Sequence, residues 1–211
     1  MLVVACNTAS ALALPAIRKE IGLDVVGVIG PGARKAVERT AGQSSARIGV
    51  IATEATIASN AYANAILRAS ETANVLQAAC PLFVPLAEEN WTSEPETFSI
   101  AKRYLRSMVE FEPDALVLGC THYPILSEVI TQTIGENVQL IDSGEAAADE
   151  VADLLVATGA DNRGSILGSR TLCDDLDHFY VTDAAERFAR VAERFLGTEP
   201  SQIEAVELSD L

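Results

Sequence analysis

Short apolar runs alternate with longer segments of helical periodicity along most of the chain. The runs that predict strands are residues 2–5, 25–29, 48–52, 80–84, 115–118 and 138–141. The segments that predict helices are residues 11–21, 33–40, 57–72, 97–110 and 123–134, followed by 145–158 and 184–196 around a short segment at 165–173. This alternation predicts an α/β fold with parallel sheets and helices on both faces.

Two of these strand–helix units repeat one local pattern. Residues 2–8, Leu-Val-Val-Ala-Cys-Asn-Thr, are similar to residues 116–122, Leu-Val-Leu-Gly-Cys-Thr-His. Each has an apolar strand, a small residue, a cysteine and two hydrogen-bonding residues, and a glycine suited to end a helix follows 15 or 16 residues after the cysteine. The repeat predicts that Cys6 and Cys120 lie at the carboxyl ends of strands, where open α/β sheets bind ligands.

Cysteines in this position are suited to proton transfer. The positive end of a helix dipole favours the thiolate, and free cysteine has a pKa of about 8.5, so a small depression creates a base near neutral pH. Two such units facing each other would place one sulfur on each face of a planar carbanion. One thiolate would then remove an α-proton, and the opposite thiol would return a proton. A single cysteine at a strand end is most often a small core residue, so the interpretation depends on the matched pair.

Composition and charge narrow the function classes. The net charge of −15 disfavours binding of nucleic acid through a basic patch. No apolar run is long enough to span a bilayer, and the first residues lack the basic region of a signal peptide. The four cysteines form no C-x-x-C pair, so they match no zinc-binding motif and indicate reduced thiols. Reduced thiols favour a location in the cytoplasm. The chain has only three lysines and no glycine-rich phosphate loop, so no cofactor is expected.

The cysteine motifs resemble those of a known family. Ala5-Cys6-Asn7-Thr8-Ala9-Ser10 is similar to the first cysteine motif of the glutamate racemases, within the cofactor-independent aspartate/glutamate racemases. Gly119-Cys120-Thr121-His122-Tyr123-Pro124 is similar to their second motif. Residues 51–53, 80–86 and 140–143 match other signatures in the family order, so the resemblance covers about the first 150 residues.

The resemblance implies roles for individual residues. Cys6 and Cys120 are the two acid/base groups, and neither a cofactor nor a metal is required. The substrate-binding residues are Asn7, Thr8, Thr121 and His122, and His122 also assists Cys120. Taken alone, Asn7, Thr8 and Thr121 also suit ordinary helix caps, and His122 also suits a cap or a core position.

Two further residues follow from the resemblance. The family has a supporting acidic residue after the run Pro-Leu-Phe-Val-Pro-Leu, which is Glu88 here or, as the alternative, Glu89. Thr53 is implied as another substrate contact. The pattern alone leaves open a solvated carboxylate at a helix start for Glu88.

The resemblance also implies a domain organisation. The family fold has two similar doubly wound parallel-sheet domains related by pseudo-symmetry, with the site between them. Here the first domain would comprise residues 1–30 and 141–211, and the second residues 31–140. The chain starts at the strand that leads into Cys6, so we expect it to lack the family's N-terminal Asp-Ser strand and to have an incomplete first domain.

The implied activity is interconversion of L- and D-glutamate, which supplies D-glutamate for peptidoglycan and the cell wall. The small-molecule partner would be glutamate, and the family is often dimeric, which leaves a homodimer open. One alternative is a racemase for aspartate or another α-acidic substrate. A second is an inactive, truncated paralogue that acts as a binding module.

Overall fold

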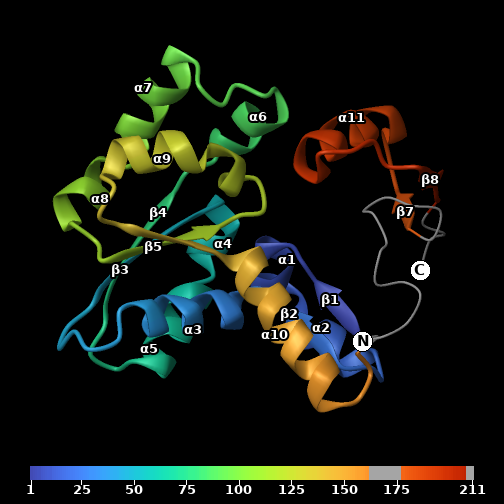
Figure 1. Cartoon of the computed structure of the whole chain (residues 1–211), viewed down its shortest axis with the longest axis horizontal. Coiled ribbons are helices and arrows are strands. Elements are labelled where there is room, and N and C mark those ends of the chain that lie inside the picture. The colour runs from blue at the N-terminus through green and yellow to red at the C-terminus, as the bar shows by residue number, and fades with distance from the viewer. Residues whose placement is uncertain (162–176, 208–211) are drawn as a thin grey trace. The chain divides into compact units, whose positions relative to one another are not determined.

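The structure is a computed structural model that describes residues 1–161 and 177–207 (Figure 1). The chain forms two compact units, Met1–Gly159 and Ala160–Leu211. The first unit carries every residue for which the sequence predicts a role in the site. No helix within residues 1–161 or 177–207 has the length and apolar character needed to cross a membrane.

A four-stranded parallel sheet forms the centre of the first unit. Its strand order is β4-β3-β5-β6, and the strands are β3 (Arg47–Ala52), β4 (Asn74–Ala79), β5 (Ala115–Gly119) and β6 (Gln139–Asp142). The central strands β3 and β5 are apolar and almost wholly buried, as expected for parallel strands covered on both faces.

Alternate side chains of the central strands fill two separate cores. Ile51, Leu116 and Leu118 belong to one apolar cluster, while Val50 and Val117 belong to the other. The first cluster includes residues of the helices on one face of the sheet, and the second includes residues of helices on the opposite face. Figure 1 shows these two sets of helices above and below the sheet. Helices on the first face are α6 (Phe83–Glu88), α7 (Pro95–Tyr104), α8 (Arg106–Phe111), the 3-10 helix η1 (Tyr123–Leu126) and α9 (Ser127–Ile134); those on the second are α3 (Ile29–Arg39) and α5 (Ala61–Ala69).

A second, two-stranded parallel sheet carries the first cysteine motif. β1 (Leu2–Val4) pairs with β2 (Val25–Gly27), and α1 (Asn7–Leu12) and α2 (Leu14–Glu20) connect them. β5 and β6 form the corresponding parallel pair, connected through η1 and α9. The sequence repeat is therefore also a repeat of strand pairing. α10 (Ser143–Ala157) follows β6 and packs against α3.

The predicted strand at residues 80–84 is wrong. The fourth strand of the sheet lies just before it, at Asn74–Ala79, and pairs along its whole length with β3. The amide of Cys80 donates the last bond to this neighbour, at 2.9 Å to the carbonyl of Ala52. Pro81 follows and has no N–H to continue the ladder, so the chain turns and the apolar run forms α6.

Two predicted helices are each divided into two. The segment predicted at 57–72 covers the end of α4 (Glu54–Ala58) and all of α5, which are separated by Ser59 and Asn60. Asn60 has a left-handed backbone with φ 54°, which breaks the helical path. The segment predicted at 97–110 covers most of α7 and of α8, which are separated at Leu105.

In the second unit, the described residues 177–207 form a small parallel sheet and one helix. β7 (His178–Val181) pairs with β8 (Gln202–Ala205), and α11 (Ala185–Leu196) connects them. The predicted helix at 184–196 is confirmed, whereas the two strands had no counterpart in the prediction. The predicted segment at 165–173 lies outside the described residues.

Candidate active site

Cys6 is positioned by the start of a helix. It is the N-cap of α1, and its Sγ accepts a hydrogen bond from the backbone N–H of Ala9 at 3.4 Å. A donor from the first helical turn stabilises negative charge on the sulfur. The side chain is exposed, so the thiol can be reached from solvent. The predicted location at a helix N-terminus is confirmed for this cysteine.

Cys120 has a different environment. The prediction that it opens an α-helix is wrong, because a turn and η1 follow it and α9 begins only at Ser127. The thiol is buried, and this burial raises its pKa. Hydrogen bonds from the backbone of His122 and from the side chain of Thr121 act in the opposite direction. The two sequence motifs are therefore similar, but the thiol is exposed at the start of an α-helix at Cys6 and buried before a turn at Cys120.

The two cysteines lie close enough to interact electrostatically. Negative charge on Cys6 is among the causes that raise the pKa of Cys120. A thiolate at Cys6 therefore disfavours a second thiolate at Cys120. The arrangement favours a state with one thiolate and one neutral thiol, which is the state that a two-base proton transfer requires.

His122 connects Cys120 to a carboxylate. Its Nδ1 lies 3.9 Å from the Sγ of Cys120 and 3.2 Å from the Oγ1 of Thr121. Its Nε2 lies 3.3 Å from the Oε1 of Glu88. Glu89, the alternative acidic residue, is exposed and forms the C-cap of α6. The structure thus brings Glu88 to His122 from a helix on the same face of the sheet.

Three threonine hydroxyls meet beside the first cysteine motif. The Oγ1 of Thr8 lies 2.9 Å from that of Thr53 and 3.1 Å from that of Thr56, and these last two are 3.0 Å apart. Thr53 is also the N-cap of α4 and accepts from the backbone of Thr56. The cluster joins α1 to α4. It places Thr8 and Thr53, the two threonines of this cluster that were predicted to contact the substrate, side by side.

Asn7 is the most enclosed of the predicted substrate-binding residues. It is 2 % exposed, and its Oδ1 accepts from the hydroxyl of Tyr62 at 2.7 Å and from that of Ser143 at 3.1 Å. Its Nδ2 has no hydrogen-bond partner within the described part of the chain. A buried donor without a partner is costly, and an acidic ligand would satisfy it.

Gly119 lets the second cysteine strand approach its neighbours. A Cβ at this position would lie 2.8 Å from the carbonyl oxygen of Ile51 and 3.0 Å from the ring of Tyr62. The first contact is too short and involves backbone that cannot rotate away, and the second is tighter than an ordinary van der Waals contact. The small residue before Cys120 is therefore required by packing.

Comparison with known proteins identifies the family. Residues 1–151 match the family described as Asp/Glu/Hydantoin racemase. The glutamate racemase of Geobacter metallireducens is 48% identical over 208 residues, which cover 99% of this chain and 73% of that protein. The chain belongs to the aspartate/glutamate/hydantoin racemase family. It is accordingly a cofactor-independent racemase by family, and the resemblance in its cysteine motifs is confirmed.

Solved structures of racemases share the fold. A glutamate racemase of Bacillus anthracis has a TM-score of 0.84 at 34% identity, covering 98% of this chain and 73% of that chain. A glutamate racemase of Francisella tularensis, solved in complex with D-glutamate, also has a TM-score of 0.84 at 34% identity, covering 97% and 72%. The predicted α/β fold with two parallel-sheet domains is thus confirmed at the level of the fold.

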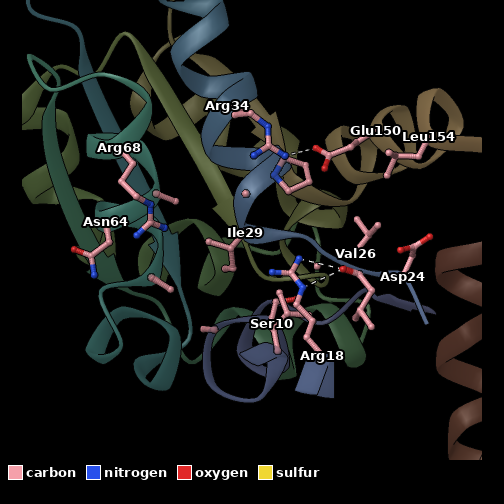
Figure 2. A pocket seen from close by; sticks show the side chains of 18 of the residues that line it. Ser10, Arg18, Asp24, Val26, Ile29, Arg34, Asn64, Arg68, Glu150 and Leu154 are labelled. Carbon is pink, nitrogen blue, oxygen red and sulfur yellow. Dashed lines mark hydrogen bonds and ion pairs between the residues drawn. The ribbon is translucent and has the colours of Figure 1, made fainter. Parts of the chain in front are cut away.

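A pocket of about 690 Å³ in this racemase is lined by residues other than those predicted for the site (Figure 2). Arg18 projects into it and donates to the carbonyl of Val25 at 3.2 and 3.0 Å, and Arg34 pairs with Glu150 across it. Arg68 extends toward the pocket from α5. Arg18 and Arg34 thus make contacts within the protein. Neither Cys6 nor Cys120 lines this pocket.

The racemase structure adds three residues that the sequence reasoning missed. Tyr62, Ser143 and Thr56 each bond to a predicted substrate-binding residue, and each is almost fully buried. Ser143 lies within a segment already noted for its resemblance to a family signature, whereas nothing in the local pattern marks Tyr62 or Thr56. In residues 1–161 and 177–207, no three His, Cys, Asp or Glu side chains form a group that could hold a metal ion.

Proposed function

We propose that this chain interconverts L- and D-glutamate. The observation that carries the proposal is that Ser143 contacts both cysteine motifs, at Asn7 and at Leu118, and that Cys6 lies near enough for its charge to raise the pKa of Cys120. A two-base racemase needs two such thiols acting on one carbon. The relatives support the choice of substrate, because the most similar proteins reported above are glutamate racemases and one was solved with D-glutamate bound.

The proposed reaction uses one thiolate and one thiol. A thiolate removes the α-proton, so the Cα–H bond breaks, an S–H bond forms and the electron pair remains on the substrate as a carbanion. The opposite thiol then gives its proton to the other face of the carbon and becomes a thiolate. Atoms and charge balance, the configuration is inverted, and the acid and base exchange roles for the reverse reaction.

Polar groups around the cysteines would hold the acidic substrate. We assign the α-carboxylate to the unpartnered Nδ2 of Asn7 and to hydroxyls of Thr8, Thr53 and Thr121. Donors fixed before the substrate arrives stabilise the negative charge that develops in the transition state. This stabilisation is needed because the α-proton of an amino acid is only weakly acidic.

His122 and Glu88 would assist Cys120. Cys120 is buried and its pKa is raised, so its deprotonation needs help from a nearby group. The Nδ1 of His122 is within reach of the sulfur, and Glu88 at Nε2 stabilises the imidazolium that forms when the ring takes a proton. This pair would replace the helix dipole that acts at Cys6.

The wider role follows from the same proposal. Supply of D-glutamate for peptidoglycan in the cytoplasm is the cellular role that we propose. We further propose that residues 1–30 with 141–211 and residues 31–140 are the two domains, with the substrate held where their cysteine motifs meet. A homodimer stays a prediction.

Circular dichroism tests the activity directly. L- or D-glutamate incubated with the purified chain and no added cofactor should lose its optical signal until the racemic mixture is reached. The double variant Cys6→Ser/Cys120→Ser serves as the matched control and should leave the signal constant. A folded wild-type chain that leaves both enantiomers unchanged would contradict the proposal, and conversion of aspartate alone would move the substrate to another acid.

A further inference from the structure

Three buried polar side chains from three helices converge behind the first cysteine. Asn7 begins α1, Tyr62 lies in α5 and Ser143 begins α10. We propose that Tyr62 and Ser143 are positioning residues that fix the side-chain amide of Asn7, so that its Nδ2 faces the substrate carboxylate. This inference rests on the proposed function and adds two residues to it.

The contacts are short and shielded from solvent. The hydroxyl of Tyr62 lies 2.7 Å and that of Ser143 3.1 Å from the Oδ1 of Asn7. Tyr62 is 1 % exposed, and Asn7 and Ser143 are each 2 % exposed. Water therefore does not compete for these bonds, and a polar group in such a site depends on its protein partners.

The two hydroxyl donors fix the orientation of the Asn7 side-chain amide. Burial raises the pKa of Tyr62, so this residue keeps its proton and acts as a donor. Ser143 is a second donor to the same oxygen. Rotation of the Asn7 amide by half a turn would remove the acceptor from both hydroxyls and direct an oxygen at the substrate carboxylate. The two hydroxyls thus hold Nδ2, which has no partner of its own in the described chain, as the group left for a ligand.

Ser143 also connects the two cysteine segments. Its Oγ lies 3.1 Å from the carbonyl oxygen of Leu118 as well as 3.1 Å from the Oδ1 of Asn7. Leu118 precedes Cys120 by two residues, and Asn7 directly follows Cys6. Ser143 has one hydroxyl proton and donates it to one of these oxygens at a time, so its hydroxyl contacts both segments while Tyr62 remains a donor to Asn7.

A glycine makes room for this arrangement. A Cβ at Gly32 would lie 3.1 Å from the Cβ of Ser143 and 3.3 Å from the hydroxyl of Tyr62. α3 therefore packs closely against both positioning residues from a third direction. The hydroxyls are confined by packing as well as by hydrogen bonds, which limits the rotamers open to them.

Steady-state kinetics of the racemase reaction provide the first test. Tyr62→Phe and Ser143→Ala should each raise KM for glutamate about three- to tenfold and change kcat less, because the lost orientation weakens binding in ground and transition states alike. In the Asn7→Ala background, Tyr62→Phe should raise KM no further, because its effect acts through the amide. Multiplicative effects of Tyr62→Phe and Asn7→Ala on KM would overturn the proposal.

Tyr104→Phe is the matched control. Its hydroxyl accepts from the backbone N–H of Leu82 at 3.2 Å and has no contact with Asn7. The same atom is removed from a tyrosine on another helix, so KM should stay at the wild-type value. An equal rise of KM in Tyr104→Phe and Tyr62→Phe would mean that loss of any tyrosine hydroxyl disturbs the fold, and it would overturn the assignment.

A second measurement does not need activity. In protein labelled with 15N-asparagine, the side-chain amide signals of Asn7 are identified by their loss in Asn7→Ala. Tyr62→Phe should shift these signals, and Tyr104→Phe should leave them in place. If the wild-type chain does not racemise glutamate, the proposed function fails, and these signals alone decide whether Tyr62 orients the amide. Unmoved signals in Tyr62→Phe would overturn the inference.

Discussion

The Nε2 atom of His122 lies 3.3 Å from a carboxylate oxygen of Glu88. The two residues are far apart in sequence, one after the carboxyl end of β5 and the other in the last turn of α6. Their contact places a carboxylate behind the imidazole whose other nitrogen faces the Cys120 sulfur. The imidazole of His122 therefore lies between the Cys120 thiol and the Glu88 carboxylate. A proton that passes from the thiol to the imidazole would be stabilised by the carboxylate.

Replacing Glu88 tests whether its carboxylate supports proton transfer through His122. Glu88→Gln keeps the shape but removes the charge that stabilises the imidazolium, so kcat should fall about tenfold with little change in KM. Glu89→Gln removes a neighbouring exposed carboxylate and should retain wild-type kinetics. Steady-state rates in both directions check the prediction. An equal fall of kcat in both variants would mean that the net charge of α6 matters and that the contact with His122 does not. A fall of kcat in Glu89→Gln alone would make Glu89 the supporting carboxylate.

The roles of the two cysteines separate in deuterated water. Cys6→Ser and Cys120→Ser should each abolish racemisation, because inversion needs a proton donor on the opposite face. Each variant should still exchange the α-proton of one enantiomer, which proton NMR detects as loss of the α-signal. Cys80→Ala removes a buried thiol of the core cluster and should retain racemisation. Wild-type turnover in either active-site variant would exclude the two-base scheme.

Alkylation should distinguish the thiols of the free protein. Cys6 is exposed, whereas Cys120 is 7 % exposed with a raised pKa and Cys80 is fully buried. Since the thiolate is the reactive form, iodoacetamide should modify these three described thiols in the order Cys6, Cys120 and Cys80. Peptide mass spectrometry at several times gives the order. Modification of Cys80 at the rate of Cys6 would show that the core around α6 opens readily.

The buried core thiol predicts a pH dependence of stability. Burial raises the pKa of Cys80 to about 12, whereas a thiol in the unfolded chain titrates near 8.5. Between these values the folded state keeps a proton that the unfolded state loses, so the free energy of unfolding falls as the pH rises. One such group contributes a slope of about 1.4 kcal/mol per pH unit within this window.

Urea unfolding of wild type and Cys80→Ala measures this contribution. The wild type should lose stability more steeply than the variant from about pH 8.5 to about pH 11, while both have similar slopes at lower pH. Other groups with raised pKa values are common to the two proteins and cancel in the difference. Parallel curves over the whole range would contradict the assignment.

The sequence was a good guide wherever local pattern decides the structure. β3 and β5 were predicted because they are continuous apolar runs, and Cys6 was placed at a helix start because polar residues follow a strand. β4 was missed because Asn74 and Gln77 interrupt its apolar character, and its pairing with β3 is a long-range effect. The apolar run after it resembled a strand, but two prolines direct it into α6.

The polar network shows where local pattern is insufficient. A tyrosine in an amphipathic helix is usually a packing residue, and nothing near Tyr62 indicates that its hydroxyl reaches Asn7, 55 positions earlier. The same is true of the contact of Thr8 with Thr56. The choice between Glu88 and Glu89 likewise depends on which face of α6 meets His122, and one short helix does not encode that face clearly.

The close approach at Gly119 has a consequence for how this chain can evolve. The distance of 2.8 Å from an added Cβ to the Ile51 carbonyl leaves no rotamer through which a larger residue could escape. A neighbouring substitution cannot compensate, because the obstacle is main chain and is present whatever side chain position 51 carries. In a randomised library selected for growth that depends on the enzyme, codons at 119 should converge on glycine while the flanking core positions drift among apolar residues.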